Sequence, residues 1–348
     1  MVKTTFEDYS MKKSLLALAV LGAFAGAASA QTNVTVYGTL DVGVSKTTGT
    51  TTSIGAGDNN KLGFKGTEDL GGGLSALFQA EIRFDPDTGT TEGNGTRPMF
   101  QGQTRVGLAG GFGMVRLGRG LTANQESFAA FDPWGATRAR GAMIPFSYGP
   151  YGSDPLNPAN ATQNRFSNAL FYNTPVMSGF QANVTVATKE TGALAFTPTR
   201  TPVSFSGTYT NGPIGAMVGY ERNAIDAKVW NVGGTYAFGP AKLFVTYAKT
   251  SASDVAGLPA GVLAAGIPLA GFDAKTWTLG TNVNVGVGKV LAAYGQSRPD
   301  AGAKTKRASL GYEYPLSKRT YLYTDAVNMK TDGIDSTRTF DVGVHHNF

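Results

Sequence analysis

The stretch that decides the fold is Leu74–Phe84, which reads LSALFQAEIRF. Every second residue from its start is apolar, and the residues between them include Gln79, Glu81 and Arg83. A period of two is typical of a strand with one apolar and one polar face. About ten residues is also the length with which a tilted strand crosses a bilayer. A single strand of this kind would suit a soluble sandwich equally well, so the rest of the chain must decide.

The N-terminal segment has the layout of a secretory signal peptide. A basic pair, Lys12-Lys13, precedes the apolar run Ser14–Ala25, and an A-x-A cleavage site ends at Ala30. The residues before Met11 include two acids and fit this layout poorly, so we expect translation to start at Met11. We therefore predict a cleaved leader over residues 1–30, followed by one domain over residues 31–348.

The same alternation recurs to the end of the chain. We predict about sixteen strands, at Asn33–Val44, Leu62–Gly66, Leu74–Phe84, Thr104–Ala109, Met114–Gly118, Ser167–Tyr172, Gln181–Thr188, Val203–Tyr209, Ala216–Glu221, Val229–Phe238, Lys242–Thr250, Thr276–Val285, Lys289–Gln296, Lys306–Tyr314, Thr320–Met329 and Thr339–Phe348. Many two-faced strands behind an export signal favour an all-β, antiparallel transmembrane barrel. A barrel of this size encloses a water-filled lumen.

Composition agrees with a barrel and excludes several other classes. The chain is 41% hydrophobic but only 16% charged, and it holds 47 glycines, 14 tyrosines and 20 phenylalanines, which suits strands, tight turns and aromatic girdles. It has no cysteine, which excludes disulfides, thiolate nucleophiles and cysteine-ligated metals. The net charge of +6 is spread over polar faces and not massed on one element, so it indicates pore polarity and not a nucleic-acid partner.

The connections alternate between short and long. Thr67–Gly73, Gly110–Gly113 and Phe238–Pro240 read as tight periplasmic turns, whereas the long segments Asp85–Met99 and Ser251–Phe272 read as extracellular loops. The longest irregular stretch, from Leu121 to about Asn164, is rich in proline, glycine and aromatic residues. A loop of this length is usually functional.

Several segments together resemble one known family, the trimeric general porins of Gram-negative outer membranes, in their beta-proteobacterial form. The resemblance covers the whole mature chain. It is carried by Gln31–Gly38, Asn60–Leu74, Arg105–Gly113, Val115–Arg119 and Val344–Phe348.

The resemblance implies a sixteen-stranded barrel, three barrels to a complex, and a third extracellular loop folded into each pore as a constriction. Basic residues on the wall would face acidic residues of that loop. Lys61, Arg105 and Arg165 match the basic wall positions, and strand parity independently turns all three inward. For Arg165, this parity places Phe166 on the lipid side. An inward position is also favoured energetically, because a cation on the lipid face costs about 2–4 kcal/mol at the midplane.

The loop departs from the family pattern, because its tip reads FDPWG over Phe131–Gly135. Its candidate acids are Glu126 and Asp132, and Arg138 and Arg140 follow closely, which makes the expected field more positive. Three further residues on polar strand faces are predicted to line the lumen: Glu81, Arg83 and Arg116.

The C-terminus and the histidines bear on assembly and on catalysis. The last strand ends flush on Phe348, which we expect to matter for assembly. The two histidines, His345 and His346, are adjacent and so point to opposite faces of one strand. They cannot form a two-ligand metal site alone, and we predict neither a metal nor a cofactor.

The sequence therefore predicts a porin of the Gram-negative outer membrane that passes small hydrophilic solutes by diffusion and prefers anions. The expected partners are two further copies of the chain, outer-membrane lipid and lipopolysaccharide, and the barrel-assembly machinery, with no nucleic acid. A substrate-selective channel is the alternative within the same class. A barrel enzyme, such as a lipase or protease, and a barrel adhesin or phage receptor are the alternatives from other classes.

Overall fold

The computed structural model describes residues 33–135, 140–149, 151–155, 164–188, 200–251 and 273–348, and most of them lie in strands. The long strands are β1 (Asn33–Thr47), β3 (Lys61–Gly71), β4 (Leu74–Arg83), β5 (Thr104–Gly110), β6 (Gly113–Leu121), β7 (Arg165–Asn173), β8 (Phe180–Ala187), β9 (Val203–Asn211), β10 (Ile214–Arg222), β11 (Lys228–Phe238), β12 (Ala241–Ser251), β13 (Ala274–Val285), β14 (Gly288–Pro299), β15 (Thr305–Pro315), β16 (Thr320–Thr331) and β17 (Thr337–Asn347). Four short elements lie in the connections: β2 (Ser53–Gly55), α2 (Ala123–Phe128), the 3-10 helix η1 (Ala129–Phe131) and α3 (Ile144–Tyr148).

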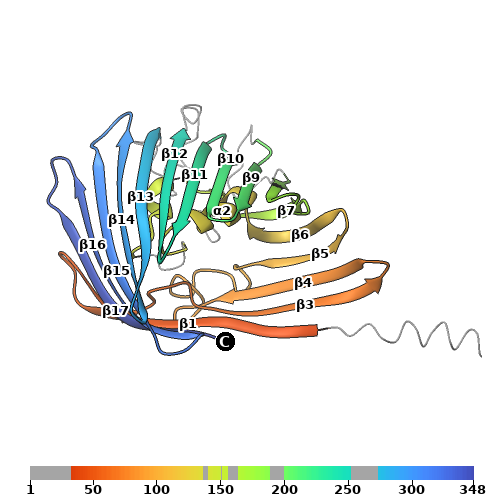
Figure 1. Cartoon of the computed structure of the whole chain (residues 1–348), viewed down its shortest axis with the longest axis horizontal. Coiled ribbons are helices and arrows are strands. Elements are labelled where there is room, and N and C mark those ends of the chain that lie inside the picture. Colours follow the sequence, from red (N-terminus) through yellow and green to blue (C-terminus); the bar gives the residue numbers. More distant parts are fainter. Residues whose placement is uncertain (1–32, 136–139, 150, 156–163, 189–199, 252–272) are drawn as a thin grey trace, which may run out of the picture.

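The sixteen long strands form one closed antiparallel sheet, which confirms the predicted barrel. The strand β1 closes the ring, because its first half (Asn33–Thr39) pairs with β3 and its second half (Thr39–Thr47) pairs with β17 (Figure 1). At the junction, the backbone of Phe348 exchanges two hydrogen bonds of 3.1 Å with Gly38. The ring therefore leaves no open sheet edge along β1.

Side chains alternate between the two faces of the sheet as the period of two predicts. On β12, Leu243, Val245 and Tyr247 point outward and are exposed, whereas Thr246 and Ala248 point inward and are buried. The exposed face is apolar because hydrocarbon surrounds it, and the inner face is largely polar because it lines the lumen. Among the described residues, no helix is long and apolar enough to cross a bilayer.

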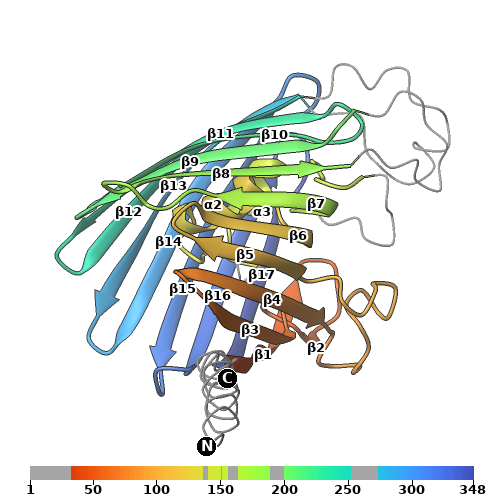
Figure 2. The same cartoon turned by 90° about the vertical axis from the view of Figure 1, so that its right-hand side faces the viewer.

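Tight turns such as Gly72-Gly73 join the strands at one end of the barrel. The described connections 48–60 and 84–103 are longer and lie at the other end, which we call the long-connection end (Figure 2). The turn predicted over Thr67–Gly73 is shorter than expected. The strand β3 continues to Gly71, and only Gly72-Gly73 form the turn. These three glycines have φ near +60° to +80°, a conformation that glycine adopts without strain.

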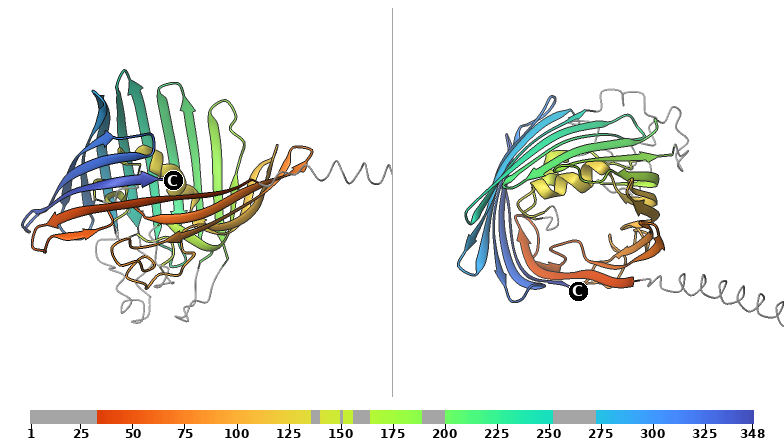
Figure 3. Two further views of the ribbon diagram at one scale, coloured as in Figure 1. Left: turned by 90° about the horizontal axis from the view of Figure 1, so that it is seen from below. Right: turned by 45° about the vertical axis from the view of Figure 1, so that its right-hand side comes forward.

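The connection between β6 and β7 carries α2, η1 and α3, which lie inside the barrel (Figure 3). It is the third long connection in chain order. Its helix α2 lies against β8, β9 and β10, and α3 lies against β12 and β13. We refer to residues 122–164 as the inner loop.

Candidate pore constriction

Two arginines stand side by side on the lumen wall opposite the inner loop. Arg105 on β5 is 5% exposed, and Arg116 on β6 is 8% exposed. Their guanidinium groups lie over the buried ring of Phe171, 5.3 and 5.8 Å from its centroid. Cation–π contact with this ring restricts both groups to one region of the wall.

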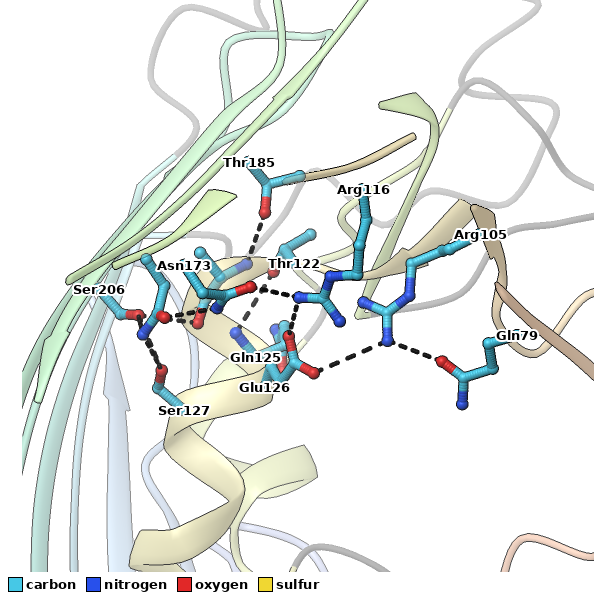
Figure 4. A network of polar contacts seen from close by, with 12 residues as sticks. Gln79, Arg105, Arg116, Thr122, Gln125, Glu126, Ser127, Asn173, Thr185 and Ser206 are labelled. Carbon is cyan, nitrogen blue, oxygen red and sulfur yellow. Dashed lines mark hydrogen bonds and ion pairs between the residues drawn. The ribbon is translucent and has the colours of Figure 1, made fainter. Parts of the chain in front are cut away.

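Both arginines converge on one carboxylate of the inner loop, Glu126 (Figure 4). The Nη2 atoms of Arg105 and Arg116 lie 3.8 and 3.5 Å from its oxygens. Each arginine also donates a hydrogen bond to a neutral wall residue, Arg105 to Gln79 at 2.9 Å and Arg116 to Asn173 at 2.5 Å. Two cations therefore share one acid across the lumen, so the local charge is positive.

The wall holds the helix that carries Glu126. Thr122 caps α2 by accepting a hydrogen bond from the backbone N–H of Gln125 at 3.3 Å. The N–H groups of Ala123 and Asn124 donate to hydroxyl oxygens of β8 and β9, at 2.9 and 3.0 Å. The first turn of a helix leaves such donors without intrahelical partners, and here the sheet supplies the acceptors.

A buried carboxylate, Glu221 on β10, ties two parts of the inner loop to the wall. It accepts hydrogen bonds from Thr122, from Ser153 at 2.5 Å and from Tyr151 at 3.2 Å. Ser204 of the neighbouring strand donates a further bond at 3.1 Å. Burial raises the pKa of the Tyr151 hydroxyl well above its ordinary value, so this group stays a neutral donor.

A second group of charges lies nearer the long-connection end. Glu81 follows Gln79 by two residues on β4, which is a rise of about 7 Å. Arg83 donates to it from Nε at 2.8 Å, and Lys61 stands directly opposite Arg83 in the pairing of β3 with β4. Arg165 is 7% exposed and interacts electrostatically with Arg83 and Glu81.

Strand parity places Arg165 in the lumen and Phe166 on the lipid face, and the position of Phe166 is wrong. Phe166 is 1% exposed and packs with Ala169 and Phe171. Asn168 has φ of 47°, and the pairing of β6 with β7 shifts register nearby, so the alternation breaks at this point. Both residues at the start of β7 are therefore buried.

Asp132 and Arg140 of the inner loop do not face these arginines. Asp132 is 3% exposed and accepts backbone N–H bonds from Trp134, Met143 and Ile144 at 2.7–2.8 Å. Burial raises the pKa of its carboxyl, and these donors oppose that shift. It organises the loop itself, whereas the sequence suggested a second acid of the constriction. The Nε of Arg140 lies 3.3 Å from Asp341 on β17, across the lumen. Arg138 lies outside the described residues.

Glycines let the inner loop lie against the far wall, a signal that sequence reasoning missed. A β-carbon at Gly280 would collide with the ring of Pro133, and one at Gly311 would meet Trp134. Trp134 Nε1 also donates to Asp325 on β16 at 2.8 Å. Glycine inside a strand often marks such a close approach, so inward-facing glycines could have indicated where the loop runs.

Open space surrounds the constriction within the lumen. A cavity of about 520 Å³ is lined by Arg116, Glu126 and Lys242, together with neutral polar residues of β7 to β9. Another, of about 410 Å³, is lined by Lys65, Arg105 and Arg116. Arg116 belongs to both, so solutes in either space meet its charge.

One further charged group lies in the lumen at the barrel seam. His345 Nδ1 lies 2.9 Å from Asp41 and 3.5 Å from Asp58, and Tyr323 donates to Asp41 at 2.7 Å. Within the described part of the chain, these two aspartates and the histidine are the set whose ligand atoms, all within 4.8 Å of one another, could hold a metal. Because they already contact each other and their neighbours, we describe them as a hydrogen-bonded clasp between β1, β17 and the first long connection.

Comparison with known proteins identifies the family. The sequence profile described as Gram-negative porin matches residues 17–334. Outer membrane porin protein 32 of Delftia acidovorans is 34% identical, with 92% of this chain and 90% of that protein covered. An outer membrane porin protein of Bordetella pertussis is 29% identical, with 97% of this chain and all of that protein covered.

A solved structure leads to the same family. The anion-selective porin from Comamonas acidovorans superposes with a TM-score of 0.76 at 27% identity, covering 91% of this chain and all of that one. The closed barrel, the wall of cations and these matches agree, and the chain belongs to the Gram-negative porin family of the outer membrane.

Proposed function

We propose that this porin passes small hydrophilic solutes and ions by passive diffusion and that it prefers anions. The observation that carries the proposal is the pairing of Arg105 and Arg116 with the single carboxylate of Glu126. The second group adds Lys61, Arg83 and Arg165 around Glu81, with Asp58 and Glu92 also acting on Lys61 and Arg165. A solved relative is named an anion-selective porin, which supports the same preference here.

Charges at a narrow point act on ions through the field they create there. Low-dielectric walls focus this field and raise the local concentration of counter-ions. Salt screens it, since the Debye length falls from about 10 Å at 0.1 M to about 3 Å at 1 M. Anion preference should therefore be largest in dilute salt.

The orientation and assembly that we propose follow the family. The tight turns would face the periplasm, the long connections would face outside, and three copies would associate in a membrane of phospholipid and lipopolysaccharide. Residues 1–30 would be a leader removed on export. The barrel-assembly machinery would insert the chain, and Phe348, which pairs with Gly38 at the seam, would be needed for this step.

The rival functions differ in what they would show in a planar bilayer. A diffusion pore conducts ohmically without added substrate, a substrate-selective channel is blocked by its substrate, and a barrel enzyme barely conducts. We favour a channel over an enzyme because the two histidines of the chain, His345 and His346, point to opposite faces of β17. An adhesin role would depend on the outer connections and is compatible with a pore.

Reversal potential in a KCl gradient tests the proposal directly. The purified protein should conduct and should give a potential of the sign expected for chloride preference, growing as the salt is diluted. A cation-selective pore in dilute KCl would refute the anion preference, and absence of conductance would refute the diffusion channel.

A further inference from the structure

The clasp at the barrel seam brings together three metal-ligating side chains that are distant in the sequence. Asp41 lies on β1, Asp58 in the connection 48–60 and His345 on β17. All three are buried, with exposed fractions of 0%, 8% and 4%. From the sequence we expected no metal, because the two adjacent histidines cannot form a two-ligand site alone. Closure of the barrel brings carboxylates from the other end of the chain to one of them.

The facing atoms of the clasp have the spacing of ligands around a zinc ion. Nδ1 of His345 lies 2.9 Å from Oδ2 of Asp41 and 3.5 Å from Oδ2 of Asp58. The ligand atoms of the three residues all lie within 4.8 Å of one another. Tetrahedral ligands about 2.0–2.1 Å from zinc are roughly 3.3 Å apart. An ion could therefore enter between these atoms with only small side-chain movements.

Protein donors hold the other oxygen of each carboxylate. Oδ1 of Asp41 accepts a hydrogen bond from the hydroxyl of Tyr323 at 2.7 Å and another from the backbone N–H of Gly57 at 3.0 Å. Oδ1 of Asp58 accepts one from the backbone N–H of Asn59 at 2.5 Å. Each carboxylate thus keeps its Oδ2 turned toward the histidine ring. Partners of this kind orient the ligands of metal sites.

The backbone and the imidazole ring of the clasp are held as well. The side chain of Asn60 accepts a hydrogen bond from the N–H of Asp41 at 2.6 Å, and it donates to the carbonyls of Asp41 and Asp58 at 3.0 and 3.2 Å. One amide therefore fixes both segments that carry the carboxylates. The ring of His345 stacks on Tyr321, with centroids 4.5 Å apart and planes 16° apart. Ligands held in place before an ion arrives lower the entropic cost of binding it.

The clasp carries more negative charge than its own groups neutralise. Two buried carboxylates face one imidazole nitrogen, which carries a single proton and can donate a full hydrogen bond to only one of them at a time. Lys61 acts electrostatically on Asp58, but it acts on Glu81 as well. Buried charges are costly unless they are paired or coordinate a metal. A divalent cation would satisfy both carboxylates at once.

We propose that Asp41, Asp58 and His345 bind a Zn²⁺ ion that stabilises the closed seam of the barrel. One imidazole nitrogen with two carboxylate oxygens suits zinc, whereas Ca²⁺ and Mg²⁺ prefer oxygen ligands alone. Three protein ligands leave the fourth position of the tetrahedron to water. Because the ligands come from β1, β17 and the connection 48–60, the ion joins the first and last strands. An ion that binds only this folded arrangement stabilises it.

Zinc binding to the purified barrel, prepared without a histidine tag, tests the site. Equilibrium dialysis against Zn²⁺ should give one tightly bound ion per barrel, and Zn²⁺ should raise the midpoint of thermal unfolding. Asp58→Asn should lower the affinity about a hundredfold or more, because it removes a ligand that lies outside the strands. Tyr323→Phe should lower it about tenfold, because it only frees Oδ1 of Asp41. The matched control His346→Gln removes the other histidine, which is exposed, and should bind zinc like the wild type.

Several outcomes would overturn the proposal. One is a wild type that binds no zinc, and another is equal binding by Asp58→Asn and His346→Gln, which would show an adventitious ion only. Displacement of the zinc by an equal concentration of Ca²⁺ would refute the choice of metal, and an unchanged thermal midpoint would refute the role at the seam. Circular dichroism should show the same strand content in every variant, and if one variant misfolds, the wild type and the remaining variants still decide.

Discussion

The two halves of the lumen wall are built in opposite ways. From β3 to β7 the wall is bare of loop helices, although the inner loop reaches it with the side chains of Glu126 and Asp154, and its inward positions carry arginine and lysine. From β8 to β16 the inner loop covers the wall, and the inward positions there include glycine, serine and threonine. Small side chains occur where the loop backbone lies on the sheet, beside charged residues such as Glu221 and Asp325 that hold the loop.

This division explains why one loop can act on selectivity without contacting the whole ring. The covered half fixes the position of α2, and α2 presents Glu126 to the bare half. Selectivity then depends on the bare half and on one acid. Four substitutions test this division, from the largest expected effect to the smallest.

Asp132→Ala should have the largest effect, because it removes the hydrogen bonds that hold the inner loop together. Three buried N–H donors of the loop would lose their acceptor, and hydrogen bonds to a charged group contribute about 1.5–3 kcal/mol each. The barrel itself should stay folded, since its strand pairing is untouched. We expect faster protease cleavage within the inner loop and a larger, noisier single-channel current.

Asp132→Asn keeps one acceptor oxygen and serves as the control, with an intermediate result. Wild-type cleavage rates and currents in the alanine variant would show that Asp132 does not hold the loop together.

R105Q/R116Q should come next, with the anion-to-cation permeability ratio falling about tenfold in dilute salt. Each charge about 5 Å from a passing ion is worth roughly 0.8 kcal/mol in water, and the two together give this factor. Lys289→Gln removes a lumen cation at the tight-turn end of β14, outside both charged groups, and should leave the ratio nearly unchanged. The assignment of the constriction fails if both variants behave alike.

Glu126→Gln should change the ratio in the opposite direction, by about threefold, because one negative charge is removed beside two arginines. Its carboxylate is 38% exposed, so water screens it and the effect is smaller than that of the arginine pair. A shift toward cations in the same KCl gradient would contradict the geometry described for the constriction.

Lys61→Gln should have the smallest effect, about twofold toward cations, since Glu81 and Arg83 beside it already balance in part. An effect as large as that of the arginine pair would show that the constriction lies at the second charged group, nearer the long-connection end. The same measurement therefore decides which of the two charged groups controls selectivity.

Much of the fold could be predicted from the sequence, because the alternation of apolar and polar residues indicates which face of the sheet each side chain occupies. All sixteen predicted strands overlap a long strand of the barrel. Their ends were predicted less well, since β1 and β3 continue into polar residues where alternation no longer separates the two faces. At Asn168 a local irregularity reverses the faces, and alternation alone gives no sign of it.

The sequence predicted which residues belong to the candidate site better than it predicted how they are arranged. Parity turns Arg105 and Arg116 inward, but it does not state their height along the barrel, and that height decides that they share Glu126. The role of Asp132 depends on N–H groups about two and eleven residues away, which only the folded loop brings together. Glycines on inward positions were the one local signal of the loop's path.

The clasp of Asp41, Asp58 and His345 has a consequence for how the chain finds its final pairing. If β17 slipped by one residue against β1, Val342 and Val344 would turn into water, and Asp341 and His345 would turn into hydrocarbon. The correct alignment alone lets His345 meet Asp41 across the seam. The pairing of β17 with β1 thus includes a polar contact that only the observed register allows.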